Sequence, residues 1–197
     1  MKLNRSIFRF SYLALQRRYV FPKIFLKDIN DLEIDVLRSH SIQGVVFDID
    51  QTLSLPNENK INERVLNSFL RIQSAFKVCA LSNLELAMSS EAAFSRGLEF
   101  ERLYNLRVIL PKLKKPHPSG FRLARRYLNL KPPHIAFIGD RLLTDTIGAN
   151  YSRFYSIQVA PLDITADEPT IRIFRRFENL ILHTHNFFHP KSSPTEE

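Results

Sequence analysis

The stretch Gly44–Leu53, GVVFDIDQTL, is the part of the chain that decides the fold. It begins as an apolar run typical of a strand buried on both faces, and it continues into Asp48, Asp50 and Thr52. Carboxylates this close together repel one another unless a positive group lies between them. The stretch therefore predicts a strand of a parallel sheet with a functional site at its carboxyl end.

Strand-like and helix-like segments alternate along the rest of the chain. Apolar runs predict strands at residues 42–49, 76–81, 106–110, 134–139 and 155–160. Apolar residues at helical spacing predict helices at residues 61–72, 91–97, 118–130, 144–150 and 168–182, and Gly97 is expected to end the second of them. This alternation predicts an α/β fold, a three-layer Rossmann-like parallel sheet with helices on both faces.

Composition limits the classes of function. The 197 residues are 44% hydrophobic and 24% charged, which suits one globular domain. A single cysteine, Cys79, excludes an internal disulfide and a cysteine-based zinc site. The net charge of +8 favours anionic partners: nucleic acid, acidic lipid headgroups or phosphorylated metabolites. No apolar stretch approaches the roughly 20 residues that a membrane-spanning helix needs.

Residues 1–30 form a basic segment rich in aromatic side chains. Seven Lys and Arg residues precede the first acid, Asp28. Cationic and apolar side chains fall on separate faces of a helical wheel, which predicts an extra amphipathic helix. Such a helix could dock on a membrane surface, pack on the domain with its arginines in water, or serve as an organelle transit segment. We expect a catalytic domain at residues 31–185 and a frayed tail at residues 186–197.

Polar side chains follow four of the predicted strands. Because the carboxyl ends of parallel strands meet at one edge of a sheet, these side chains are expected to lie together. Carboxylates without accompanying His or Cys favour Mg²⁺ as their partner. An acid there can attack phosphorus, a second acid can protonate the departing alkoxide, and a lysine with a serine can neutralise the phosphoryl oxygens. The residues concerned are Asp48, Asp50, Ser82, Asn83, Lys114, Lys115, Asp140 and Asp145.

Simpler interpretations exist for several of these residues. A single Asp after a strand is commonly a turn or cap residue, and Asp145 could simply cap a helix. Lys114 competes with Lys115 for the phosphate, and we favour Lys115 because it directly precedes Pro116. Three histidines near the end of the chain lack acidic partners and are expected at the surface or in the tail: His183, His185 and His189.

The motifs DIDQT, LSN, KP and GDRLLTD, in this order and each after a strand, resemble those of the haloacid dehalogenase (HAD) superfamily of phosphatases. The resemblance spans about residues 40–160. More narrowly, GDRLLTD followed by GAN, APLD and RRFENLIL is similar to the YqeG-type subclass IIIA family. Relatives of that family include the mitochondrial phosphatidylglycerophosphate phosphatases.

The resemblance implies a role for each acid. Asp48 would be the nucleophile and a ligand of Mg²⁺. Asp50 would be the general acid and base and would bind the metal through its backbone carbonyl. Asp140 would be the direct acidic metal ligand after the fourth strand, and Asp145 would support it from the following helix.

The resemblance also implies a phosphate site. Thr52 would steady the first loop, Ser82 and the amide of Asn83 would hold the phosphoryl group, and Lys115 would neutralise charge between Asp48 and phosphate. Two departures bear on substrate preference: the family commonly has SNN where this chain has SNL at residues 82–84, and Asn where Gln51 stands.

The intervals after the first and second motifs have no room for a cap domain, so we expect an open site that meets a phosphate carried by something large. An anionic phospholipid fits that site, the basic first segment, and the positive charge that Arg122, Arg125 and Arg126 add on the helix after Lys115. We therefore expect Mg²⁺-dependent hydrolysis of phosphatidylglycerophosphate by a peripheral enzyme, on the cytoplasmic face of the inner membrane or in an organelle matrix. The alternatives are a soluble phosphatase acting on a sugar phosphate, nucleotide or phosphoprotein and, remotely, a nucleic-acid-binding module; no nucleic acid is expected as a partner.

Overall fold

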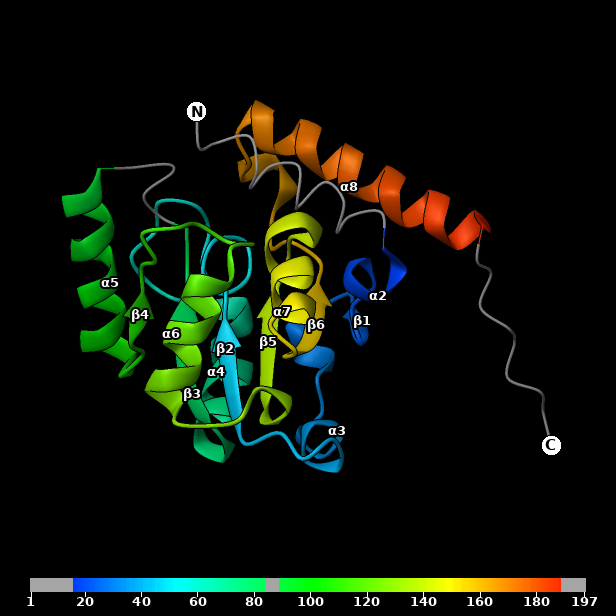
Figure 1. The fold of residues 1–197 in the computed structure, drawn as a ribbon. Coiled ribbons are helices and arrows are strands. Elements are labelled where there is room, and N and C mark those ends of the chain that lie inside the picture. The colour runs from blue at the N-terminus through cyan, green and yellow to red at the C-terminus, as the bar shows by residue number, and fades with distance from the viewer. Residues whose placement is uncertain (1–15, 84–88, 189–197) are drawn as a thin grey trace.

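Six parallel strands form one sheet in the computed structural model, which describes residues 16–83 and 89–188 (Figure 1). Across the sheet they lie in the order β1-β6-β5-β2-β3-β4, and every paired neighbour is parallel. The α/β fold expected from the alternating segments is thereby confirmed. The strands are β1 Ile24–Leu26, β2 Gly44–Phe47, β3 Lys77–Leu81, β4 Val108–Ile109, β5 Ile135–Gly139 and β6 Tyr155–Val159.

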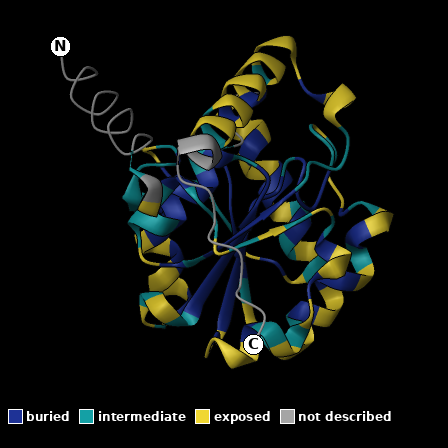
Figure 2. Ribbon diagram, turned by 90° about the vertical axis from the view of Figure 1, so that its right-hand side faces the viewer, coloured by how far each residue is buried: buried dark blue, intermediate teal, exposed yellow. Residues whose placement is uncertain are grey.

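Helices cover both faces of the sheet, because the buried strands place side chains alternately on each side. Val45 and Phe47 of β2 pack with Phe69 and Phe100 from the helices of one face. Val46 packs with a second cluster that includes Phe121 and Cys79 on the other face. The buried strands lie between partly exposed helices (Figure 2). The helices are α2 Arg17–Val20, α3 Ile34–Ser39, α4 Glu63–Ala75, α5 Ser90–Tyr104, α6 Pro118–Leu128, α7 Ile147–Tyr151 and α8 Pro169–Phe188.

Helix α5 differs from the expectation. It runs through Gly97 to Tyr104, so the predicted end at Gly97 is wrong. The left-handed residue that ends it is Asn105, with φ 49°. Asn is the residue after Gly that best tolerates this conformation, and here its backbone N–H caps two carbonyls of the last turn.

Residues 1–30 contribute a strand that the sequence analysis did not predict. Strand β1 pairs with β6 and extends the sheet at that edge. Just before it, Val20 is buried against Leu142 and Ile147, and the side chain of Asn150 donates hydrogen bonds to two carbonyls of the same segment. The expected amphipathic helix falls largely on residues 1–15, outside the described residues.

The last helix also reaches further than expected. Helix α8 extends to Phe188, into the range 186–197 that we expected to be frayed, and residues 189–197 lie outside the described part of the chain. Within the described ranges, no helix is both long and apolar enough to span a bilayer.

The site lies where the chain changes direction across the sheet. From β2 the chain proceeds to β3 and β4 on one side, and β5 and β6 then fill the other side. In doubly wound sheets, ligands bind at this switch point, beyond the carboxyl ends of the strands. The acids after β2 and β5 are therefore brought side by side, and in the described residues that follow β2 and β3 there is no additional domain over them.

Candidate active site

Lys115 lies between two buried carboxylates. Its ammonium Nζ donates to Asp48 Oδ1 at 2.6 Å, and it forms an ion pair with Asp145 Oδ1 at 2.8 Å. The Asp48 backbone is fixed at the end of β2, because its N–H donates to the carbonyl of Ile138 on β5 at 2.8 Å. The structure therefore brings together residues from three predicted motifs. Lys114, the alternative to Lys115, is only half-buried.

Three carboxylates form a compact buried cluster. One oxygen from each of Asp48, Asp140 and Asp145 lies within 4.8 Å of the others. The hydroxyl of Thr52 donates to Asp140 Oδ1 at 3.3 Å, and Arg175 forms an ion pair with the other oxygen of Asp140. Three hard oxygen ligands gathered at this spacing fit Mg²⁺, which takes a few carboxylates and keeps several waters.

The electrostatics of the cluster follow from its burial. Burial raises the pKa of Asp48 well above its ordinary value; Lys115 opposes this shift, and the other two acids add to it. For Asp140, burial raises the pKa to about 6, against the opposing charge of Arg175. Burial alone would lower the pKa of Lys115, but Asp145 and Asp48 outweigh it and the pKa rises above its usual range. The lysine thus stays charged, and a further positive charge would favour the ionised form of the buried acids.

Asp145 is placed by a close approach to the backbone. A Cβ added at Gly139, the last residue of β5, would lie 2.5 Å from Asp145 Oδ2, far inside van der Waals contact. The same oxygen accepts a hydrogen bond from the N–H of Arg141 at 3.0 Å. Any side chain at residue 139 would therefore push this carboxylate out of the cluster.

Asp50 is held by an arginine that the sequence analysis missed. Arg96 of α5 is buried, and it donates to Asp50 Oδ1 at 2.7 Å. The same guanidinium donates to the carbonyl of Glu58 at 2.6 Å, so it also secures the loop after the first motif. The Asp50 side chain remains 32% exposed, which leaves one face open toward solvent. Nothing in the local sequence marks Arg96, because it lies on a helix between motifs.

Asn83 of the second motif, LSN, positions Lys115 of the third motif, KP. Ser82 is buried at the end of β3. Asn83 Oδ1 accepts a hydrogen bond from the N–H of Lys115 at 2.8 Å, and its amide donates to the carbonyl of the same residue at 3.2 Å. The Asn83 side chain therefore clamps the backbone of Lys115, a contact that the motif spacing did not reveal.

Helix α8 closes a second network around the site. Arg175 pairs with both Asp140 and Asp167, and Asp167 accepts a hydrogen bond from the side chain of Gln51 at 2.9 Å. One turn along, Glu178 pairs with Arg141 at 3.0 Å. Gln51, a departure from the family pattern, thus links the first motif to α8. The motif RRFENLIL predicted a helix, but nothing in it indicated that Arg175 and Glu178 would form buried ion pairs beside the site.

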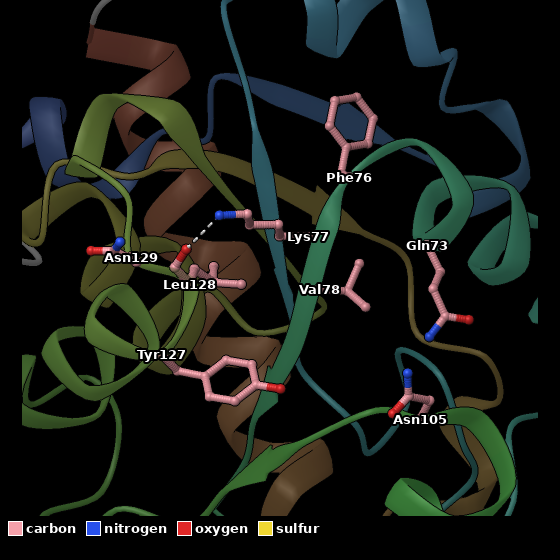
Figure 3. Close-up of a pocket in the computed structure, with 8 residues that line it drawn as sticks. All are labelled: Gln73, Phe76, Lys77, Val78, Asn105, Tyr127, Leu128 and Asn129. Atoms are coloured by element: carbon pink, nitrogen blue, oxygen red, sulfur yellow. Dashed lines mark hydrogen bonds between the residues drawn. The ribbon is translucent and has the colours of Figure 1, made fainter.

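A pocket of about 460 Å³ lies near the amino end of β3 (Figure 3). Its wall includes Lys77, the first residue of β3, whereas Ser82 follows the last residue of that strand. The acids follow the carboxyl ends of the parallel strands, whereas this pocket lies at the amino end of β3, so the two sites are separate. Its remaining lining is uncharged: Gln73, Phe76, Val78, Asn105, Tyr127, Leu128 and Asn129.

Comparison with known proteins gives a consistent set of matches. The family model described as mitochondrial PGP phosphatase matches residues 5–160. The chain is 27% identical over 175 residues to phosphatidylglycerophosphate phosphatase 1, chloroplastic/mitochondrial, of Arabidopsis thaliana, covering 87% of this chain and 50% of that protein. It is 28% identical over 167 residues to the probable phosphatase YqeG of Bacillus subtilis, covering 84% and 91%.

A third relative is the mitochondrial phosphatidylglycerophosphatase GEP4 of Saccharomyces cerevisiae, 27% identical over 143 residues, covering 70% of this chain and 76% of the yeast protein. The chain thus spans only half the length of its Arabidopsis relative, but most of the bacterial one. These matches confirm the resemblance that the motifs predicted.

Proposed function

Because the chain belongs to the mitochondrial PGP phosphatase family, we propose that it hydrolyses phosphatidylglycerophosphate to phosphatidylglycerol and inorganic phosphate. The names of the Arabidopsis and yeast relatives support this substrate. The observation that carries the proposal is Lys115, with its Nζ 2.6 Å from Asp48 and 2.8 Å from Asp145. An ammonium fixed beside a nucleophilic carboxylate can neutralise the oxygens of an arriving phosphoryl group.

The proposed cofactor is Mg²⁺. Asp48, Asp140 and Asp145, with the carbonyl of Asp50, would hold the ion. When bound, it supplies positive charge opposite the phosphoryl oxygens. The buried cluster supports this assignment, because its carboxylates outnumber the cations in contact with them.

In the first half-reaction, a carboxylate oxygen of Asp48 attacks phosphorus and forms an aspartyl-phosphate. The ester P–O bond breaks, its electron pair leaves with the glycerol oxygen, and the carboxyl group of Asp50 donates the proton that makes this oxygen an alcohol. Lys115, the hydroxyl of Ser82 and the backbone N–H of Asn83 would hold the phosphoryl oxygens meanwhile.

In the second half-reaction, the Asp50 carboxylate takes a proton from water as the water oxygen attacks phosphorus. The bond between phosphorus and Asp48 breaks, which returns the Asp48 carboxylate and releases phosphate. Arg96 holds Asp50 for both proton transfers, since its guanidinium is buried and anchored to the following loop.

The openness of the site supports a large substrate. The described residues that follow β2 and β3 hold loops, α4, α5 and β4 but no lid domain. A small metabolite would remain exposed to water in such a site, whereas a phosphate on a lipid headgroup can be presented from a surface. The relatives' names, chloroplastic/mitochondrial and mitochondrial, support an organelle as the location, and within it we propose the matrix.

The test is phosphate release from phosphatidylglycerophosphate in mixed micelles. We expect release with Mg²⁺, none after EDTA treatment, and a loss of at least about 10³-fold in Asp48→Asn, because this change removes the nucleophile. Lys114→Met serves as the matched control and should retain most of the activity.

The same preparations are assayed with p-nitrophenyl phosphate and with sugar phosphates and nucleotides. Asp48-dependent hydrolysis of a soluble metabolite, together with an untouched lipid, would leave the chemistry in place and contradict the lipid substrate. Activity that is unchanged in Asp48→Asn would contradict the mechanism itself.

A further inference from the structure

Helix α8 exposes large apolar side chains although it buries two charged ones. The most buried side chains of its described part are charged, Arg175 and Glu178, and they are accompanied by partly buried Ile181 and Leu182, which pack against Val20, Leu142 and Ile147. Its outer face carries four large apolar side chains, which are 64%, 53%, 55% and 57% exposed: Ile173, Phe174, Phe177 and Leu180. Burial of apolar area is the main force that orders helices on a protein, so this outward placement indicates a second apolar partner.

The exposed apolar residues form one stripe. Ile173, Phe177 and Leu180 are spaced by four and three residues and so lie on one side of a helix, with Phe174 beside them. Exposed Arg172 and Arg176 follow one edge of this stripe. An apolar stripe edged by arginines is typical of a helix that lies in the headgroup region of a bilayer.

The charge of α8 distinguishes it from α5, another helix that exposes large apolar side chains. Helix α5 also exposes apolar side chains, Phe94 and Leu98, but its sequence includes three acids, Glu91, Glu99 and Glu101. The one acid in the whole sequence of α8 is Glu178, and it is buried in its ion pair with Arg141. Among these two faces, only that of α8 suits an anionic surface.

The inner side of the same helix contacts the active site. Arg175 pairs with Asp140, and the N–H of Leu143 donates to Glu178 at 3.0 Å. Figure 1 shows α8 on the side of the molecule to which β2 and β5 point, where the acids lie. A surface in contact with α8 would therefore lie near the entrance of the site.

We propose that the outer face of α8 docks on an anionic phospholipid bilayer and presents the active site to phosphates in its headgroup region. The presentation of substrate rests on the proposed function. Binding of α8 to a bilayer does not, and it can be measured without turnover. It differs from docking by residues 1–30, because α8 is a separate helix with its own apolar stripe and arginines.

The test is co-sedimentation of the full chain with vesicles of phosphatidylcholine alone and of phosphatidylcholine mixed with phosphatidylglycerol. We expect binding to the mixed vesicles and a loss of about tenfold or more in the double variant Phe174→Ser, Phe177→Ser. The matched control is Phe94→Ser, Leu98→Ser, which removes a similar exposed apolar area from α5 and should bind like wild type.

A second variant, Arg172→Gln with Arg176→Gln, should lose affinity for the mixed vesicles and change little on neutral ones. Equal binding by wild type and Phe174→Ser, Phe177→Ser would overturn the proposal. So would a wild-type dimer that this variant dissociates while vesicle binding persists, since a second copy would then cover the stripe.

Hydrolysis of p-nitrophenyl phosphate separates this inference from the proposed function. The α8 surface variants should retain the wild-type rate, because none of the substituted side chains contacts the acids. A chain that hydrolyses no ester but loses vesicle binding in Phe174→Ser, Phe177→Ser would support docking and contradict the proposed function.

Discussion

At the scale of single residues, Arg96 holds the side chain of Asp50, the proposed proton donor. Its guanidinium holds Asp50 at 2.7 Å and is itself buried. We expect Arg96→Met to lower kcat/KM for an alkyl phosphate by about 10²-fold, because a misplaced acid no longer protonates the alkoxide. The loss for p-nitrophenyl phosphate should be much smaller, since p-nitrophenolate leaves without a proton.

Arg102→Met, on the same helix, is the control for this comparison. Its ion pair with Glu99 is largely exposed, and such pairs contribute about 0–1 kcal/mol, so both substrates should be turned over as by wild type. Equal losses for the two esters in Arg96→Met, at unchanged thermal stability, would indicate that Arg96 does not act through Asp50.

The raised pKa of Asp140 predicts a pH-dependent response to metal. With a pKa of about 6 against an ordinary 3.8, the folded protein holds this proton more tightly than the unfolded chain does. Its contribution to stability is therefore present at low pH and lost as the pH rises through about 6. Mg²⁺ should raise the Tm strongly near pH 8 and weakly near pH 5, where the proton competes with it.

Differential scanning fluorimetry over this pH range measures the effect, and Asp140→Asn is the control that should respond weakly to Mg²⁺ at every pH. A Tm increase that is the same at pH 5 and pH 8, within roughly a degree, would speak against Asp140 as a ligand.

The main acids and the lysine of the site were predictable from the sequence because they follow strands, and parallel strands end at one edge. Asp48, Lys115 and Asp140 belong to this group. Arg96 and Arg175 were not predictable in this way, since each reaches its partner from a helix 46 or 35 residues distant in the chain. An arginine on an amphipathic helix has the same local pattern whether it faces water or a buried acid.

At the level of elements, Arg175 and Glu178 of α8 hold the segment after β5, which carries two of the proposed metal ligands, Asp140 and Asp145. Replacing Arg175 by Met leaves Asp140 and Asp167 buried without their guanidinium, which should lower stability by about 3–5 kcal/mol without metal. Bound Mg²⁺ should restore part of this loss, because it neutralises Asp140. We expect the Tm deficit of Arg175→Met to be larger in EDTA than in Mg²⁺.

The neighbouring Arg176 is exposed on the same helix, so Arg176→Met tests whether any arginine of α8 has this effect. It should leave the Tm unchanged with and without metal. Should Arg175→Met lose the same Tm in both buffers, the coupling between α8 and the metal ligands would be refuted.

The end of β5 gives a second test at this scale. Gly139→Ala should destabilise the protein by about 1–3 kcal/mol and weaken the Mg²⁺ response, because its Cβ would meet the side chain of Asp145. Gly97→Ala inside α5 should instead be neutral or stabilise by up to about 1 kcal/mol, since the new Cβ lies 3.4 Å from Val108 and Ala favours helix. Urea unfolding of the two variants with matched m-values provides the comparison, and a stable Gly139→Ala would contradict the packing argument.

Most elements of the fold were predictable, because buried strands and amphipathic helices differ in period. The exceptions were those whose stability comes from neighbours. Strand β1 is only three residues long, and its pairing with β6 depends on the rest of the sheet. Helix α5 continues past Gly97 because Phe100 beyond it is buried in the core, which overrides the helix-ending tendency of one glycine.

At the scale of the whole molecule, the net charge of +8 and the arginine-edged face of α8 predict that the proposed docking on a membrane is controlled by electrostatics. Salt should therefore weaken the association of the enzyme with an anionic membrane more than it slows the chemical step. Raising the ionic strength from about 0.05 to about 0.5 M should lower kcat/KM for phosphatidylglycerophosphate in phosphatidylglycerol-rich vesicles by roughly tenfold, because exposed charges are screened beyond a few ångströms at high salt. The same lipid diluted in neutral detergent micelles is the control, since its surface carries little charge and its kcat/KM should change by much less. Equal decreases of kcat/KM on both surfaces would contradict this prediction and place the salt effect at the catalytic site. The buried charges of Asp48, Lys115 and Asp140 are only weakly screened by salt, so the salt ions would then have to compete for the phosphate or metal site.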